Sequence, residues 1–198
     1  MSSRFACWLT ILTLGLTLLT ISADRAHADT IEPNLEAQKS SMDKDSNLRL
    51  ELAASLNAPV AKVYAALTNP EKLSKYNAEI TSVKVLSSSA TGKVVEYYGT
   101  SNLNLNKKPY VIKFTFDPGK QTITAQSVDK AGITFRADYV LSLSKDGKST
   151  EIRYVSVSAN PSKALGMPVP EFMRKTAGIE AFMRNLTNAG KYIQNGEK

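Results

Sequence analysis

The sequence feature that most constrains the fold is the C-terminal segment from Pro168 to about Ile193. Its apolar and small residues recur at steps of three and four, which places them on one side of an α-helix. Pro168 and Pro170 favour a first helical turn, where their missing N–H groups are not needed. Such a helix is about 36 Å long at roughly 1.5 Å per residue, so its apolar stripe must lie against an equally long apolar surface. The stripe consists of Phe172, Thr176, Ile179, Met183, Leu186, Gly190 and Ile193.

Alternating segments earlier in the chain can supply that surface. Apolar and polar residues alternate in about seven runs, as in strands that bury one face. The turns Asp117-Pro118-Gly119-Lys120 and Asp146-Gly147 are typical of hairpins. The runs are Leu48–Leu56, Ile80–Leu86, Lys93–Ser101, Tyr110–Phe116, Gln121–Val128, Ile133–Leu143 and Thr150–Ala159.

Two short helical segments follow the first of these runs, at Val60–Leu67 and Glu71–Tyr76. The chain shows no internal repeat. The sequence therefore predicts an α+β domain. In this domain a curved antiparallel sheet of about seven strands surrounds the long C-terminal helix, and two short helices follow the first strand.

The N-terminal residues predict export. Arg4 precedes an apolar run from Phe5 to Ile21, and Ala26-His27-Ala28 is a small-x-small cleavage site, so residues 1–28 are predicted to be a signal peptide. The alternative is an uncleaved membrane anchor, because the run is close to the minimum length for spanning a bilayer. Residues 29–46 are polar and without periodicity, which predicts a flexible leader before a domain over residues 47–198. The mature protein is predicted to be a periplasmic or secreted monomer.

Removal of the signal peptide also removes most of the usual catalytic side chains. Cys7, Trp8 and His27 are the only residues of their types in the chain. The mature sequence then lacks a thiol nucleophile, an imidazole base and any His or Cys metal ligand. It also contains no phosphate-binding loop, so no cofactor and no metal are predicted.

Charged residues in the strands offer few catalytic candidates. Glu96 either faces the interior, as a carboxylate of raised pKa that could act as acid or base, or faces solvent, which the nearby Lys93 favours. Arg136 and Asp138 lie on the face opposite Phe135 and are interpreted as an exposed charge set. The sequence thus favours a binding protein over an enzyme.

The net charge points to acidic partners. The chain carries +7, of which residues 1–28 contribute +1 through two arginines and one aspartate, so the mature protein carries +6. A positive surface favours an acidic protein or an anionic membrane surface, and the alternative is a solvated basic surface that only aids solubility. Export and the lack of a basic run argue against nucleic acid as a partner.

One local pattern resembles a known superfamily. Ala58–Tyr64 and Leu67–Leu73 read as Pro-x-x-x-Val-aromatic followed by Asn-Pro-Glu, which is similar to the opening of helix-grip proteins. This superfamily includes START lipid-transfer domains, the birch-pollen allergen family, polyketide cyclases and coenzyme Q-binding proteins. The resemblance extends over residues 47–194, although Tyr76 stands near the position where the family often has Trp. It implies a curved sheet around the C-terminal helix, with a cavity between them for an apolar ligand.

Alternating aromatic residues are the candidates for contact with such a ligand. Several of them are tyrosines, whose hydroxyl groups need partners when they are buried. Ordinary core packing is the alternative interpretation for each residue. Met167, with Leu165 and Val169, is a candidate portal beside the helix start, or else a hydrophobic staple. The remaining candidates are Tyr110, Ile112, Phe114, Phe135, Tyr139 and Tyr154 from the strands, and Phe172, Thr176, Ile179 and Met183 from the helix.

Three functions are consistent with these observations. The favoured one is a periplasmic binding or carrier protein for a lipid-like or other hydrophobic small molecule, held between the sheet and the C-terminal helix. The second is an accessory protein whose basic face docks an acidic redox partner. The third is an enzyme of the cyclase or hydratase kind, which requires an inward-pointing carboxylate.

Overall fold

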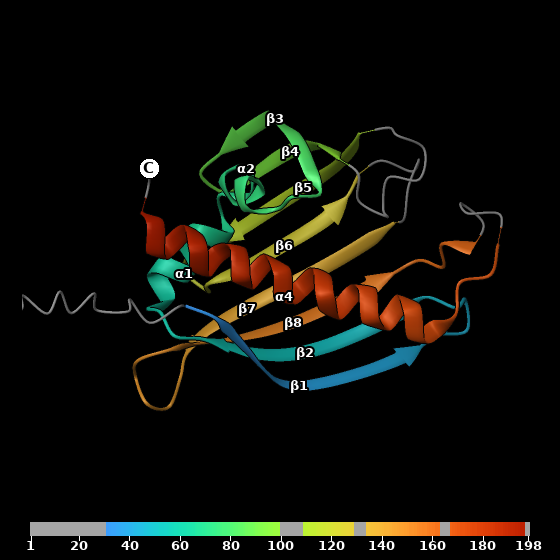
Figure 1. Ribbon diagram of the computed structural model, residues 1–198, viewed down its shortest axis with the longest axis horizontal. Coiled ribbons are helices and arrows are strands. Elements are labelled where there is room, and N and C mark those ends of the chain that lie inside the picture. Colours follow the sequence, from blue (N-terminus) through green and yellow to red (C-terminus); the bar gives the residue numbers. More distant parts are fainter. Residues whose placement is uncertain (1–30, 100–108, 129–133, 163–166, 197–198) are drawn as a thin grey trace, which may run out of the picture.

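The computed structural model describes residues 31–99, 109–128, 134–162 and 167–196. Eight strands form one antiparallel sheet in the order β1-β2-β8-β7-β6-β5-β4-β3, and α4 crosses one face of it (Figure 1). The predicted α+β arrangement is confirmed. The elements are β1 (Pro33–Met42), β2 (Leu48–Leu56), α1 (Val60–Leu67), α2 (Pro70–Leu73), the 3₁₀ turn η1 (Ser74–Tyr76), β3 (Ile80–Ser89), β4 (Gly92–Gly99), β5 (Tyr110–Asp117), β6 (Thr122–Ser127), β7 (Phe135–Leu143), β8 (Thr150–Ser158) and α4 (Glu171–Asn195).

The buried face of the sheet follows directly from the alternation in the sequence. On β2, every second residue from Leu48 to Leu56 is at most 3% exposed, and the residues between them are exposed or half-buried. The register continues this inward face across the sheet, from Leu52 to Tyr154 on β8 and on to Tyr139 on β7. Period-two burial therefore builds one continuous apolar face, on which α4 lies.

The prediction of a flexible leader is wrong for residues 33–42, which form β1. This strand pairs with β2 along its whole length, from Pro33 opposite Leu56 to Met42 opposite Leu48, with a bulge after Leu35. Most of its side chains are exposed, because an edge strand is held by backbone hydrogen bonds and needs no alternating apolar residues. The domain consequently begins before residue 47, and the sheet has one strand more than predicted. The predicted signal peptide lies outside the described residues.

The predicted buried side of α4 is confirmed at Leu186 and Gly190, whereas Phe172 and Thr176 are exposed. Phe182, rather than Met183, points to the sheet at 1% exposure, whereas Met183 is half-buried. Gly178 and Gly190 bring the helix close, since a Cβ at Gly178 would meet Leu50 of β2 and one at Gly190 would meet the backbone oxygen of Ile31. The absence of a Cβ at these two glycines thus allows this side of α4 to pack closely against its neighbours. None of the helices in the described ranges is long and apolar enough to cross a membrane.

Candidate ligand-binding surface between the sheet and the C-terminal helix

Six strand residues predicted to contact a ligand lie on the face of the sheet that α4 crosses. The register sets Tyr110 of β5 opposite Tyr97 of β4, whose ring stacks on it at 5.2 Å between centroids. The predicted residues of β5, β7 and β8 alternate with residues of the outer face and therefore project to the same side. They are Tyr110, Ile112, Phe114, Phe135, Tyr139 and Tyr154.

One part of this face is closed by the helix. The ring of Phe182 stacks on Tyr154 at 4.6 Å, and Tyr139 meets Tyr154 edge-on at 4.9 Å. Nδ2 of Asn185 donates to the hydroxyl of Tyr139 at 3.4 Å. These rings are at most 9% exposed, so in this part ordinary core packing describes the tyrosines. The sequence analysis missed Phe182 because the predicted stripe included its neighbour Met183 in this turn.

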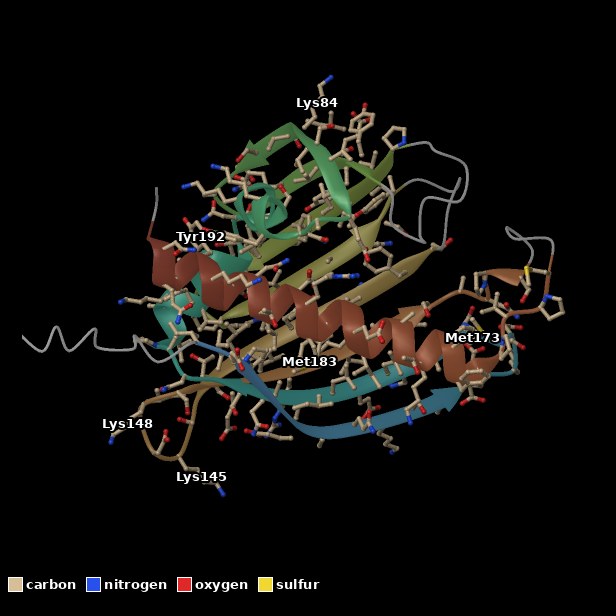
Figure 2. The ribbon with its side chains drawn as sticks, in the orientation of Figure 1. Lys84, Lys145, Lys148, Met173, Met183 and Tyr192 are labelled. Carbon is tan, nitrogen blue, oxygen red and sulfur yellow. The ribbon has the colours of Figure 1, made fainter. Side chains whose placement is uncertain are left out.

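The other part remains half-buried, although it lies on the inward face. We define the open aromatic zone as the half-buried strand residues Tyr110, Ile112, Phe114 and Phe135. These residues lie on β5 and at the start of β7, whereas among the strands α4 packs most closely on β1 and β2. Ile179 and Met183 are also half-buried, but they share the side of α4 that carries Gly190, where a Cβ would meet Ile31 next to β1. Met183 accordingly lies on the side of α4 towards β2 (Figure 2). Incomplete coverage of apolar side chains on an inward face is what a bound apolar molecule would complete.

The interior phenols remain protonated at physiological pH. Burial, together with the neighbouring Tyr110 and Glu71, raises the pKa of Tyr97 well above its usual value of 10.0. Burial also raises the pKa of Tyr139 and of Tyr154. A neutral phenol donates and accepts hydrogen bonds but does not serve as a base. These three side chains are therefore not candidates for proton abstraction.

The predicted wall is wrong at the start of α4. Phe172 is 69% exposed and Thr176 is also exposed, because Arg174 occupies the inward position of the first turns. Met167 is 61% exposed beside the helix start, where its role as a portal stays a prediction. Leu165 lies outside the described residues. Of the helical candidates, Ile179 and Met183 are half-buried but do not belong to the open aromatic zone.

A charged pair on the inward face was missed by the sequence analysis. Nζ of Lys93 on β4 donates to Oε1 of Glu71 at 2.6 Å and to Oδ1 of Asn69 at 2.9 Å. Lys93 has the same parity as the buried Val95 and Tyr97, which is the signal that could have identified it. Asn69 and Glu71 belong to the Asn-Pro-Glu motif, so the motif serves to hold this lysine.

The remaining charged candidates lie on the outer face, as predicted. The Tyr98 hydroxyl donates to Oε2 of Glu96 at 2.7 Å, while the alternate residues of β4 are buried. Nη2 of Arg136 lies 3.1 Å from Oδ1 of Asp138. Within the part of the chain that the structure describes, no group of three or more His, Cys, Asp or Glu residues could hold a metal ion.

Comparison with known proteins identifies the fold. No protein-family model and no curated protein matches the chain. The ZhuI aromatase/cyclase from Streptomyces sp. R1128 superposes with a TM-score of 0.58 at 11% identity, over 75% of this chain and 94% of that one. The chain has a helix-grip fold. A second helix-grip neighbour is TTHA0849 from Thermus thermophilus, with a TM-score of 0.56 at 15% identity over 76% of this chain and 99% of that one.

Proposed function

We propose that the protein binds a hydrophobic small molecule on the open aromatic zone and serves as its carrier. The observation that supports this proposal is the contrast between the two parts of the inward face. Phe182 of α4 and Tyr154 beneath it are 1% and 9% exposed, whereas Ile112 and Phe114 remain half-buried although they project to the same face of the sheet. An apolar ligand between β5 and the flank of α4 would remove these side chains from water, which contributes about 25 cal/mol per Å² of apolar surface.

The proposal includes a location. Residues 1–28 have the features of a signal peptide, and cleavage before Asp29 would leave a short link before β1, which begins at Pro33. The carrier would then operate in the periplasm or outside the cell. Mass spectrometry of the protein purified from its own periplasm tests this step, because a chain that retains residues 1–28 would contradict it.

Native mass spectrometry of the same preparation, followed by organic extraction, tests ligand binding. We expect one apolar molecule per chain. Two strand residues provide a matched pair of variants: Ile112 lies in the open aromatic zone, whereas Val140 is 44% exposed on the outer face of β7. Ile112→Gln is expected to reduce the occupancy severalfold, because it puts an amide against apolar surface. Val140→Gln should leave it unchanged. An empty wild-type protein would contradict the proposal.

A cyclase or hydratase activity is the second candidate, favoured by one observation. Such an enzyme requires a carboxylate on the inward side, and Glu71 is bound there to Lys93. The extracted molecule discriminates between the two functions. A carrier returns it unchanged after incubation with the protein, whereas an enzyme converts it and loses that conversion in Glu71→Gln.

A further inference from the structure

A charged pair lies between α2 and the inward face of the sheet. The side chains of Lys93 and Glu71 are only 12% and 26% exposed, and their ion pair is 2.6 Å long. Asn69 holds the same ammonium group from the start of α2. Figure 1 shows α2 on the same side of the sheet as α4, over the part that contains β4 and β5. The pair therefore belongs to the interior, where an unmatched polar atom is costly.

The second oxygen of the Glu71 carboxylate is unmatched. Oε2 is buried and has no hydrogen-bond donor among the described residues, whereas Oε1 is occupied by Lys93. An ionised carboxylate accepts hydrogen bonds at both oxygens, so Glu71 retains a free acceptor. The terminal torsion of a Glu side chain has a broad distribution, and the side chain is partly exposed, so Oε2 can turn towards an incoming donor.

This acceptor adjoins the open aromatic zone. Lys93 stands directly opposite Phe114 in the register of β4 and β5, at a distance where side chains touch. Tyr97 projects to the same face of β4, and the charge of Glu71 contributes to the raised pKa of Tyr97. A ligand that covers Phe114 would thus bring its end close to the carboxylate.

We propose that the Glu71–Lys93 pair is the polar end of the ligand site and accepts a hydrogen bond from a neutral hydroxyl group of the bound molecule. This inference rests on the proposed function and specifies the chemical class of its ligand, an alcohol or phenol with an apolar body. The charges of Glu71 and Lys93 already balance each other. A ligand carboxylate would be repelled by Oε2, and a ligand ammonium group would add an unbalanced charge.

Three naphthalene derivatives test which polar group the site prefers in its ligand, because they differ in one substituent only. β-Naphthol can donate a hydrogen bond, its methyl ether cannot, and β-naphthoate is an anion. Their dissociation constants are measured by titration calorimetry on the purified protein, after a hydrophobic resin has removed bound ligand. We expect β-naphthol to bind about tenfold more tightly than its methyl ether, which corresponds to about 1.4 kcal/mol, and β-naphthoate to bind most weakly.

The variant Glu71→Gln removes the carboxylate and is expected to reduce the preference for the hydroxyl group to about twofold or less, with the affinity for the methyl ether retained. Glu96→Gln is the matched control, since Glu96 lies on the outer face of the strand that carries Lys93. Thermal melting establishes that each variant folds. Should Glu71→Gln fail to fold, Glu71→Leu replaces the carboxylate by an apolar group of similar size.

The outcomes separate this inference from the proposed function. Equal wild-type affinities for β-naphthol and its methyl ether would overturn the inference and leave apolar binding intact. A preference that survives Glu71→Gln, or that disappears equally in Glu96→Gln, would also overturn it. Failure of all three compounds to bind would overturn both proposals.

Discussion

Arg174 is a buried cation whose replacement by Met is expected to lower the free energy of unfolding by about 3 kcal/mol. Its side chain is 8% exposed. Nη1 donates to the carbonyl of Ser46 at 2.9 Å, and Nη2 donates to the carbonyl of Ser158 at 3.1 Å and more weakly to that of Ala159 at 3.4 Å. The guanidinium group thus joins α4 to the turn after β1 and to the end of β8.

The magnitude follows from two well-formed hydrogen bonds of a charged donor. Each contributes about 1.5 kcal/mol, the low end of the range for charged groups, because removal of the guanidinium from water offsets part of the gain. Burial accordingly lowers the pKa of Arg174. Met keeps the apolar stem of the side chain, so the substitution tests the hydrogen bonds rather than the packing.

Urea unfolding followed by circular dichroism measures this loss. The matched control is Arg184→Met on the same helix, because Arg184 is 39% exposed and pairs with Glu79 at 2.8 Å. An exposed ion pair contributes about 1 kcal/mol or less. The dependence of stability on urea should stay the same in both variants. A loss below about 1 kcal/mol for Arg174→Met, or one no larger than for Arg184→Met, would refute the reasoning.

The buried tyrosines and a small residue of α4 give two further predictions. Burial raises the pKa of Tyr139 and Tyr154 above 10.0, so the folded state retains protons that the unfolded state releases, and stability should decrease as pH rises above about 10. Phenolate absorbance from these two side chains before unfolding would contradict this. Gly190→Ala is expected to cost about 1–3 kcal/mol, because its Cβ would meet the backbone oxygen of Ile31. Gly119→Ala, where a Cβ makes only ordinary contact, should unfold at nearly the wild-type temperature, and equal melting temperatures for the two variants would contradict the packing argument.

Strands that bury one face could be predicted, whereas the edge strand could not. The predicted run Leu48–Leu56 coincides with β2, and Thr150–Ala159 differs from β8 by one residue. β1 left no such pattern, because its backbone pairs with β2 while most of its side chains remain in water. Side-chain periodicity does not identify a strand that is held by backbone hydrogen bonds alone.

The candidate site was likewise predicted only in part from the sequence. The parity of β5 placed Tyr110, Ile112 and Phe114 on one face, and the structure agrees. The charged pair escaped notice because Lys93 and Glu71 are 22 residues apart and look like ordinary surface charges in the sequence. Their proximity depends on α2 folding over β4, which no local pattern encodes.

The sequence by itself determined the order of the strands and helices from β2 onward and the inward face of the sheet, because both depend on the local period of apolar residues. Tertiary structure decided which side of α4 meets the sheet. The predicted stripe included Gly190 but omitted Gly178 and Arg174, because it was chosen by the polarity of the side chains. Gly178 is required because the helix approaches Leu50 closely, and backbone carbonyls from β8 and from the turn after β1 accept hydrogen bonds from the buried Arg174. Contacts of this kind join residues far apart in the chain, so only the folded arrangement determines them.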